Sequence, residues 1–566
     1  MANHGGSVRD WLTGLFCPRV LTLSSPLVEE HARKNGLTFS QLLAPFGVVE
    51  NGGVPIRTPA GHSTTITDFR VRVVPAAYYA KAVPHEYDNG LSTLVKSIPP
   101  RTPPSDRLTR QQIVTQRDVK RYFQSTAKSE GLQAGDSTPW YTAARNELAA
   151  GGLCYEPFEQ LHQPMAIVIA ISSMDADPVA TLKELQVGDG YPQALKDGHF
   201  SAQVPKFVVV VHDTCAAHTV DPRSVLHVLH GYFRPEQCKL LTLNSFPAES
   251  PNFNQPDMWS KELGWDHPGM QLGRLPVGPR PPPGDTAPPL PFGSLLSPED
   301  LMGLQSFMTG VVTKGVSPEI ERRMFSLNQE ISASRKGFSN KLKSWWGRKP
   351  KEANPRKTQS GGPLYDIHSI ECQIRLLGDL AFMIRDYDLA MSMYRMARDD
   401  YKSDRAWHHC ASASGMLALA HHLSENGSRR DMVQAFEASI AYHTQSGGVD
   451  ELRNPWERTR LSSRNAMFAS EVVRAEGDTQ LAARWLERAA ALENKSGNGQ
   501  FHMIVALLYE QSAMCTLVGP NPKLRRAARK FLLAGYHYAY CGSMPHSFHA
   551  YAGVALLYKE TPRWNR

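Results

Sequence analysis

The sequence predicts an α/β domain followed by an all-α solenoid, and two patterns carry that prediction. In the first half, runs of Val and Ile without polar alternation, such as "MAIVIAISS" (165–173) and "KFVVVVHD" (206–213), alternate with helix signals. Such runs are typical of strands buried on both faces of a parallel sheet. From Leu364 to the end, apolar residues recur at helical spacing between short polar turns. A chain of 566 residues allows about three or four folding units.

The α/β domain is expected to span residues 1–265. Its strands are followed by Asp177-Pro178 and Asp221-Pro222, where Asp can cap a helix and Pro suits the first helical turn. The next strand candidate is "CKLLTLNS" (238–245). Neither G-x-x-x-x-G-K-[ST] nor G-x-G-x-x-G, the usual phosphate-binding motifs, occurs in the chain. We therefore expect a Rossmann-like parallel sheet without a nucleotide motif, which binds no cofactor and serves as a binding or scaffolding module.

A Pro-rich linker is expected over residues 266–296. Nine of the 27 residues from His267 to Gly293 are proline, which favours a stiff, extended connector over a packed element. A ligand for an SH3 domain is a second interpretation. It is disfavoured because Arg280 stands one position too early for a P-x-x-P-x-R motif that begins at Pro276.

Residues 297–334 are expected to be helical. The segments "SPED" (297–300) and "SPE" (317–319) each have the composition of a helix start. Four apolar residues are spaced to bury one face of the second helix: Ile320, Met324, Leu327 and Ile331. Residues 335–363 then form a basic excursion before the solenoid.

The basic excursion opens with an unusual stretch, Arg335–Lys351, which holds seven cations, two adjacent tryptophans and no acid. The window 335–357 has a net charge of +8, equal to that of the whole chain. As a helix, the stretch would carry an apolar stripe about 100° wide, formed by Phe338, Leu342, Trp345 and Trp346. Its cations include Arg335, Lys336, Lys341, Lys343, Arg348 and Lys349. Positive charge beside an apolar stripe predicts contact with an anionic membrane surface, so these ten residues are the candidate membrane-binding set.

Other interpretations of the basic helix stay open. Its stripe could be covered by the protein's own core, with the lysines as a solvated face. Membrane contact is favoured because Trp prefers the boundary between water and an apolar phase, and because "GRKPK" ends the helix there. Calmodulin or RNA could also bind a basic amphipathic helix. Because the rest of the chain is neutral, nucleic acid is not among the expected partners.

The segment 364–566 is expected to be a TPR-like α-solenoid. Five residues have the spacing of a tetratricopeptide repeat, in which small residues let two antiparallel helices approach closely: Leu377, Gly378, Ala390, Tyr394 and Ala397. The aromatic residue expected at 381 is Ala, with Phe382 beside it, so the repeat is degenerate. Weaker copies follow. We expect about four stacked helix pairs, an architecture that usually holds other proteins.

Signals for catalysis or metal binding are weak. The cluster His212, Asp213, Cys215 and His218 follows a strand end and could hold a metal ion, but spacing alone fixes no ligand geometry, so a structural loop is favoured. Other histidines and a cysteine are interpreted as surface and turn positions: His408, His409, Cys410, His421 and His422. No G-x-S-x-G or H-E-x-x-H signature occurs. No catalytic or metal-binding residue is predicted, and the chain is not expected to be an enzyme.

The cellular compartment is predicted from cysteines and hydropathy. The eight cysteines are scattered without a C-x-x-C pair, which is typical of reduced cytosolic thiols. Asp10 interrupts the mildly apolar amino terminus, and the longest apolar run, residues 165–171, is far too short to span a membrane. We expect a cytosolic protein whose membrane contact is peripheral.

Several segments carry a family resemblance: "LTFSQLLAPFG" (37–47), "STPWY" (137–141), "PDMWSKEL" (256–263), "ISASRKGFSNKLKSWW" (331–346), "LLGDLAFMIRDYDLAMSMYRMARDDY" (376–401), and "YEQSAMCTLV" with "FLLAGYHYAYCG" (509–542). In content and order, across nearly the whole chain, they resemble subunit 8 of the TRAPP trafficking complex, the 85-kDa-type subunit that defines the TRAPP III form. The block from "SRKGFS" to "YRMA" is the most specific part.

The resemblance implies a non-catalytic subunit attached to the small subunits of the TRAPP core. It implies that this core exchanges guanine nucleotide on a Rab1/Ypt1-type GTPase in ER-to-Golgi transport and autophagy, on Golgi, ER–Golgi and pre-autophagosomal membranes. Family members help to hold the complex on membranes, and the matching segment here is Arg335–Lys351. The chain stops at Arg566, so contacts of the carboxyl-terminal β-sandwich domains in longer animal forms are not expected to transfer.

Two other classes of function stay open. The β-α-β half could be an unrecognised hydrolase that uses His212 and Asp213. The solenoid could be an adaptor whose basic helix binds calmodulin or RNA.

Overall fold

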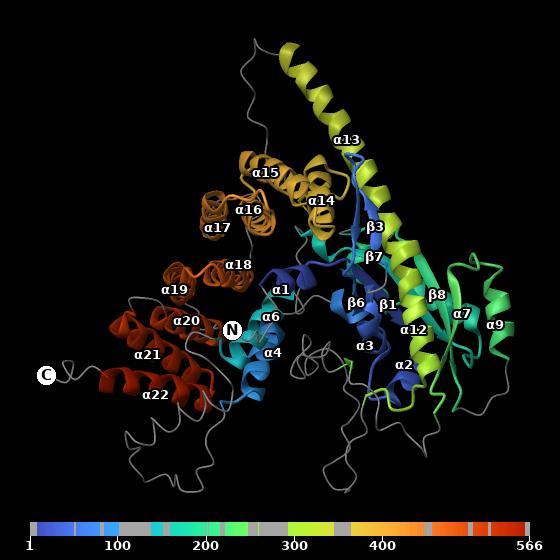
Figure 1. The fold of residues 1–566 in the computed structure, drawn as a ribbon, viewed down its shortest axis with the longest axis horizontal. Helices are drawn as coiled ribbons and strands as arrows, with labels where there is room; N and C mark the ends of the chain where they lie inside the picture. Colours follow the sequence, from blue (N-terminus) through green and yellow to red (C-terminus); the bar gives the residue numbers. More distant parts are fainter. Residues whose placement is uncertain are drawn as a thin grey trace, which may run out of the picture.

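The computed structural model describes residues 8–49, 52–79, 84–100, 137–150, 159–198, 200–201, 203–215, 221–246, 258–259, 292–344, 364–443, 445, 448, 455–495, 502–518 and 522–560. Within them, an α/β unit lies beside a curved stack of helices (Figure 1). The predicted fold class, a parallel α/β domain followed by an α-solenoid, is confirmed. Most of the predicted Pro-rich linker lies outside the described residues, but Leu295 and Leu296 near its end are buried.

The central sheet has five strands in the order β6-β1-β7-β8-β9, all parallel. The strands are β1 (Arg19–Ser24), β6 (Arg72–Pro75), β7 (Pro164–Ser172), β8 (Lys206–Asp213) and β9 (Cys238–Leu243). The three strands expected from the sequence are β7, β8 and β9, and they are confirmed. In chain order the strands run 2-1-3-4-5 across the sheet. The connections therefore change direction between β1 and β7, the position at which open α/β sheets usually bind ligands.

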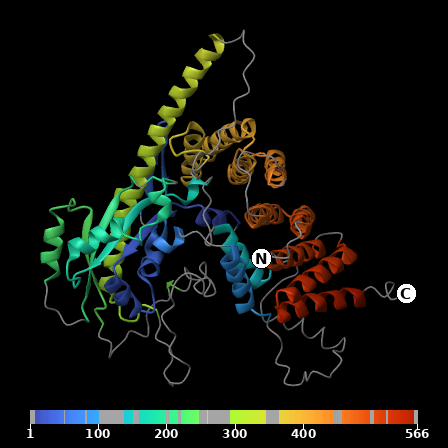
Figure 2. The same ribbon diagram turned by 180° about the vertical axis from the view of Figure 1, so that it is seen from behind.

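Helices cover both faces of the sheet (Figures 1 and 2). One face is covered by α7 (Pro178–Val187), α8 (Gln193–Lys196) and α9 (Pro222–Leu229). The other is covered by α2 (Pro26–Arg33), α3 (Phe39–Leu43) and α12 (Pro298–Val311). Asp177 and Asp221 accept hydrogen bonds from backbone N–H groups at the starts of α7 and α9, so the predicted caps are confirmed. Two-sided cover explains why β7 is buried along its whole length.

Short elements connect the strands of the α/β unit. They are η1 (Ala44–Gly47), β2 (Val48–Val49), β3 (Val54–Arg57), β4 (Ser63–Ile66), β5 (Phe69–Arg70), η2 (Ala76–Tyr79) and η3 (Gln160–His162). The β3–β4 hairpin and the β2–β5 pair are antiparallel. The hairpin lies against the next long helix, α13, because the Glu321 carboxylate accepts a hydrogen bond from the Arg57 N–H (2.6 Å).

A long helical path leads from the sheet toward the solenoid. Ser297 caps α12 in a reciprocal arrangement with Asp300, so this predicted start is confirmed. The start predicted at Ser317 is only partly right, because α12 continues through the π-helical turn η4 (Val312–Val316) into α13 (Ser317–Ser344) without leaving helical backbone angles. The Ser317 hydroxyl donates to the Pro55 carbonyl instead of capping a helix. The four residues predicted to be buried on α13 are buried: Ile320, Met324, Leu327 and Ile331.

The solenoid consists of consecutive helices that each pack on the next. They are α14 (Ile370–Met383), α15 (Tyr387–Ser403), α16 (Trp407–Leu423), α17 (Arg429–Tyr442), α18 (Pro455–Ala475), α19 (Thr479–Lys495), α20 (His502–Leu517), α21 (Leu524–Tyr540) and α22 (Met544–Glu560). At Gly378, an added Cβ would lie 3.0 Å from Cε1 of Tyr394, so glycine favours this close approach of α14 and α15. The predicted repeat geometry is confirmed there.

The interpretation of the solenoid histidines as surface residues was wrong. His408, His409, Cys410 and His421 are all buried, and only His422 is half-buried. Their helix, α16, is packed on both sides by neighbouring helices, and fifteen of its residues are buried. The His408 ring faces that of His443 at the end of α17, with Nδ1 atoms 3.2 Å apart, and His421 Nε2 accepts a hydrogen bond from Arg395 at 3.0 Å.

Three amino-terminal helices belong spatially to the solenoid: α1 (Val8–Leu15), α4 (Pro84–Ser97) and α6 (Pro139–Ala150). Figure 2 shows α4 and α6 beside the last solenoid helices. The Trp11 ring of α1 lies 5.6 Å from that of Phe468 on α18, and Trp140 of α6 is fully buried. One hydrophobic core therefore runs from the sheet through these helices into the solenoid.

Candidate functional site

The predicted basic segment begins within the second half of α13. The helical backbone continues to Ser344, which confirms helix at Phe338 and Leu342 and at the cations Arg335, Lys336, Lys341 and Lys343. Their side chains, and the whole of Trp345, Trp346, Arg348 and Lys349, lie outside the described residues. The end of α13 extends beyond the other described helices and strands in both views (Figures 1 and 2).

The first half of α13 is fixed to the rest of the protein. Its buried face continues to Ile331, whereas Ser332, Ala333 and Ser334 are exposed. Glu319 forms ion pairs with Arg322 (2.7 Å) and Arg323, and the Gln373 amide of α14 donates to Glu330 (2.7 Å). The helix is therefore anchored up to about the point where the basic segment begins.

A cluster of polar side chains lies at the carboxyl edge of the sheet, where the strand connections change direction. Ser172 ends β7, Asp213 ends β8, and His31 projects from α2 between them. The His31 ring lies 3.0 Å from Ser172 Oγ through Nε2 and 3.0 Å from Asp213 Oδ2 through Nδ1. Lys34 donates to the same Asp213 oxygen at 2.5 Å.

The contacts in this cluster connect Ser, His and Asp in the order of a catalytic triad. No motif in the sequence predicted it. In such triads, the histidine takes the serine proton during attack on a substrate. Here, however, Ser172 is 0% exposed, and its Oγ also accepts a hydrogen bond from the Met174 N–H (3.1 Å). A sealed, hydrogen-bonded hydroxyl is not placed to reach a substrate, so the contacts hold the strand ends together.

The charge of the cluster is balanced internally. Burial would raise the pKa of Asp213, but hydrogen bonds from His31 and Lys34 hold that pKa well below its ordinary value. Nearby, the Asn35 amide donates to Asn244 (2.6 Å), and the Asn244 amide donates to the His31 carbonyl (3.2 Å). The chain's own side chains thus occupy the position where related sheets receive ligands.

The hydrolase and metal interpretations of His212 and Asp213 are not supported by their contacts. The His212 ring bonds Ser173 (2.9 Å) and Asp213 bonds His31, so the two residues take part in separate contacts. Cys215 donates to the Asn244 carbonyl, and His218 lies outside the described residues. Within the part of the chain that the structure describes, no group of three or more His, Cys, Asp or Glu side chains could hold a metal ion.

A second buried polar network joins the entry to β7 with the solenoid. Glu159 pairs with Arg464 of α18 at 2.7 Å and lies 3.2 Å from His162. Asp379 pairs with Arg375 (2.9 Å) and accepts hydrogen bonds from the Tyr394 hydroxyl and the Gln160 N–H. Because both carboxylates are buried, their partners fix how the sheet unit docks on α14 and α18.

Protonation at this junction follows from burial and neighbouring charge. Burial favours a neutral Glu159, but Arg464 and His162 hold its pKa well below the usual range. For His162, burial and the nearby Arg19 lower the pKa to about 3. The network therefore holds an ionised glutamate and a neutral imidazole at neutral pH.

A third junction surrounds Trp140 of α6. Its indole N–H donates to Glu510 of α20 (2.8 Å), and the Tyr538 hydroxyl of α21 donates to the same oxygen (2.7 Å). The rings of His546 and His549 on α22 lie 4.9 and 5.1 Å from the Trp140 ring. Burial raises the pKa of Glu510 to about 7 and lowers the pKa of each histidine to about 4.

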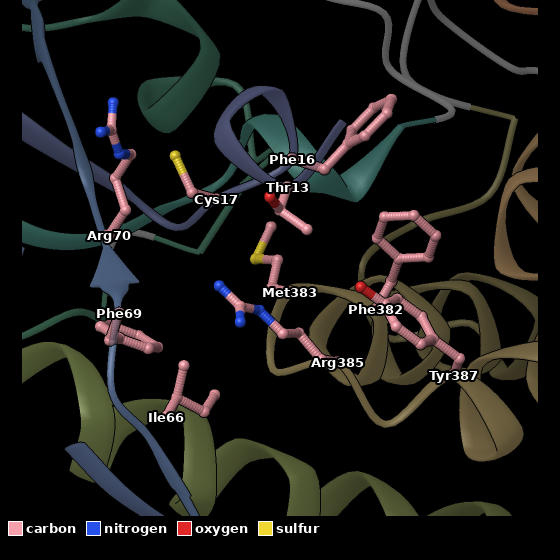
Figure 3. A pocket seen from close by; sticks show the side chains of 10 residues that line it. All are labelled: Thr13, Phe16, Cys17, Ile66, Phe69, Arg70, Phe382, Met383, Arg385 and Tyr387. Atoms are coloured by element: carbon pink, nitrogen blue, oxygen red, sulfur yellow. The ribbon is translucent and has the colours of Figure 1, made fainter. Parts of the chain in front are cut away.

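A small cavity lies between α1, the β4–β5 region and the start of α15 (Figure 3). Its volume of about 20 Å³ suits roughly one water molecule. Burial raises the pKa of Cys17, which lines it, so that thiol stays protonated and poorly nucleophilic. Arg385, at the rim, pairs with Asp68 at 2.8 Å. The cavity is a packing gap between the two units and offers no site of useful size.

No described helix is both long enough and apolar enough to cross a membrane.

Comparison with known proteins shows which protein family this sequence matches. The family "ER-Golgi trafficking TRAPP I complex 85 kDa subunit" (TRAPPC-Trs85) matches residues 12–477. The human "Trafficking protein particle complex subunit 8" is 24% identical over 629 aligned positions, which cover 99% of this chain and 41% of that protein. The "Transport protein particle subunit trs85-2" of Schizosaccharomyces pombe is 22% identical over 426 positions, covering 72% of this chain and 63% of that protein.

The match extends across both units of the structure. It begins in α1 and ends just after α18, so it contains the sheet, all of α13 and the junction with the solenoid. The chain spans about two fifths of the length of the human relative and less than two thirds of that of the yeast relative.

Proposed function

This chain belongs to the family of the 85 kDa subunit of the TRAPP ER–Golgi trafficking complex, and from that premise we propose that it is a non-catalytic subunit of the TRAPP III form that helps to hold the complex on membranes. Its partners in this proposal are the small subunits of the TRAPP core. Through them it serves guanine-nucleotide exchange on a Rab1/Ypt1-type GTPase in ER-to-Golgi transport and autophagy. It acts from the cytoplasmic side of Golgi, ER–Golgi and pre-autophagosomal membranes.

The observation that carries the proposal is the projecting end of α13. The helix is anchored as far as Ile331 and then continues past its neighbours as the acid-free segment that begins at Arg335. An amphipathic helix that is fixed at one end and extends from the body can lie against an anionic surface without unfolding its own domain. Phe338, Leu342, Trp345 and Trp346 would enter the headgroup region.

The expected binding energy is small. Each Lys or Arg near an anionic surface contributes about 1 kcal/mol and the contribution falls with salt. Five basic residues together supply a few kcal/mol at most, so binding through this segment alone is weak and reversible. They are Lys336, Lys341, Lys343, Arg348 and Lys349. The complex and the lipidated GTPase would supply further anchors, so the subunit raises the local concentration of exchange factor at the membrane.

The sheet supports a non-catalytic role. Its change of strand order, the usual ligand position, is occupied by His31, Ser172 and Asp213, and the serine is inaccessible. In the proposal, exchange chemistry therefore belongs to other subunits of the complex.

The first test is vesicle flotation of the full chain beside the variant Leu342→Asp/Trp345→Ala/Trp346→Ala. Neutral and anionic vesicles are compared at low and high salt. We expect the parent to float only with anionic vesicles and less at high salt, and the variant to remain at the bottom. The control Val228→Asp/Tyr232→Ala, which alters exposed apolar residues at the end of α9, should float like the parent.

Equal flotation of parent and variant would contradict the proposal. Calcium-loaded calmodulin or RNA is added in separate arms. Displacement from vesicles at stoichiometric amounts of either would favour the adaptor function instead. With the assembled complex, exchange on a membrane-bound GTPase should slow in the variant while exchange in solution is unchanged.

A further inference from the structure

The last two solenoid helices expose an unusual number of large apolar side chains. Of fourteen such side chains that the described residues expose, seven lie on α21 and α22. They are Leu532, Tyr536, Tyr540, Met544, Phe548, Tyr551 and Tyr558, and we call them the α21–α22 face. Tyr540 and Met544 are 65% and 63% exposed. Single exposed apolar residues are normal, but a contiguous group of them marks an interaction surface.

The seven side chains form one surface. On α21, Leu532, Tyr536 and Tyr540 follow the i, i+4, i+8 spacing of a single helical face. On α22, the exposed residues recur at three- and four-residue steps from Met544 to Tyr551. The two helices touch beside these stripes at Gly535, a buried residue of α21, where an added Cβ would lie 2.6 Å from Cε1 of Tyr551. Glycine at this position lets the Tyr551 ring lie directly on α21.

One end of this face is strongly basic. Lys523, Arg525, Arg526 and Arg529 are exposed, and a shallow hollow is lined by residues 522–526. The exposed stripe of α21 continues through Arg529 and Arg525 in the same helical register as Leu532. α21 contains no acid, and the only acid of α22 is its last residue, Glu560.

This charge is placed where a helix tolerates it least. The amino end of a helix carries partial positive charge, so cations in the first turn destabilise it and anions stabilise it. α21 has two arginines in that turn and no acid, and Lys523 at the cap position makes no side-chain capping bond. The start of α21 is therefore a concentration of exposed positive charge that no acid of the same helix offsets.

The composition of the surface indicates a protein partner. Tyr, Met and Arg are the residues enriched at the centres of protein interfaces, and Lys and Glu are depleted there. From Arg525 to Tyr540 the stripe is about 22 Å long, enough for roughly four turns of a partner helix.

We propose that the α21–α22 face docks an acidic amphipathic helix of a partner protein. Its apolar side packs on Leu532, Tyr536, Tyr540 and the α22 stripe, and its carboxylates face Arg525 and Arg529. In Figure 1, α21 and α22 lie far from the tip of α13, so the two regions can engage different partners at once.

The test uses the full chain and three stapled synthetic helices of about four turns. The first has Leu on one face and Glu on the others, the second replaces every Glu with Lys, and the third keeps Glu but scrambles the Leu positions. Affinity is measured by fluorescence anisotropy of the labelled peptide. We expect the first peptide to bind about tenfold or more tighter than the other two.

Matched variants locate the binding surface. Arg525→Glu/Arg529→Glu should weaken the acidic peptide about tenfold and improve the Lys peptide, because the charge complementarity is reversed. Tyr536→Ser/Tyr540→Ser should weaken both. The control Val228→Ser/Tyr232→Ser changes equally exposed residues on another surface and should have no effect. Circular dichroism and melting temperature verify that every variant is folded.

Several outcomes would overturn the proposal. Equal binding of the acidic and basic peptides would show that the α21–α22 face binds apolar helices without a preference for their charge. If no peptide binds, or if Tyr536→Ser/Tyr540→Ser does not change binding, the α21–α22 face does not bind an acidic helix. If the parent dimerises and Tyr536→Ser/Tyr540→Ser does not, the face binds a second copy. If that substitution abolishes vesicle flotation instead, it binds a membrane.

Discussion

At the junction between sheet and solenoid, charged groups are buried in matched pairs, whereas at the end of α13 and the start of α21 they are of one sign. Glu159 and Arg464 satisfy each other inside the protein. The cations from Arg335 onward and those near Arg525 have few acids beside them in the sequence. Paired internal charge serves to fix one docking geometry, while charge of a single sign on an extended or exposed helix creates a positive potential, and both proposals above rest on that potential.

The largest effect should come from breaking the buried pair. Replacing Arg464 by Leu leaves the Glu159 carboxylate without its main partner, so we expect the free energy of unfolding to fall by about 3–5 kcal/mol. Urea denaturation followed by tryptophan fluorescence measures it. Arg385→Leu is the matched control, because its pair with Asp68 is exposed and is worth less than about 1 kcal/mol. Similar losses of unfolding free energy in both variants would show that the buried ion pair contributes no more than the exposed one.

The next effect depends on pH and concerns the Trp140 junction. The pKa of Glu510 is raised from its ordinary value of 4.5 to about 7 in the folded protein. The ionised carboxylate is therefore less stable in the folded than in the unfolded chain, and the protein loses stability as the pH rises from 4.5 through 7. Glu510→Gln should therefore stabilise the protein by up to about 3 kcal/mol at pH 8 and have little effect below pH 4.5.

The neighbouring histidines act in the opposite direction and sharpen this test. His546 and His549 have pKa values lowered to about 4, so stability is lost as pH falls from 6.5 through 4. In the parent the two slopes partly cancel between pH 4.5 and 6.5. Melting temperatures of Glu510→Gln across pH 4–8 should show the histidine slope alone, and an unchanged pH profile would contradict the raised pKa.

A smaller effect is expected at the triad-like cluster. Ser172→Ala removes the hydroxyl that contacts His31 and accepts from the Met174 N–H, which should lower the free energy of unfolding by about 1–2 kcal/mol. Neither the parent nor the variant should react with a fluorophosphonate probe, because the hydroxyl is sealed. Stoichiometric labelling of Ser172 in the parent would instead support hydrolase chemistry.

The smallest effect on stability should come from the projecting half of α13. Leu342→Asp should change the free energy of unfolding by no more than about 0.5 kcal/mol. On the anchored half of the same helix, Ile320→Ala should cost about 2–5 kcal/mol, because this side chain is fully buried. A large destabilisation by Leu342→Asp would place that residue in the protein's own core and remove the support for a membrane-facing stripe.

The sequence predicted the features that depend on neighbouring residues. The runs that became β7 and β8, the caps at Asp177 and Asp221, and the buried stripe from Ile320 to Ile331 are local patterns, and all three were correct. The membrane-binding role of the basic segment stays a prediction. β1 and β6 were missed because "RVLTLS" and "RVVP" are short and mixed in character.

Contacts between distant segments could not be predicted. His31 meets Ser172 across 141 positions, and no spacing rule links them. The solenoid histidines look polar in the sequence, but His408 finds His443 and becomes part of the interior. The roles of Trp140 and Glu159 likewise depend on partners more than 300 positions away.

The docking of α4 and α6 on the late solenoid helices has a consequence for synthesis. Trp140 pairs with Glu510, 370 positions further along the chain. At ribosomal rates of about 5–20 residues per second, roughly 20 to 70 seconds pass before this partner has been made. During that interval the apolar faces of these helices are exposed in the nascent chain, where contacts of such long range make folding slow and aggregation a hazard. Production of this protein should therefore depend on chaperones that hold its first 150 residues until translation reaches α22.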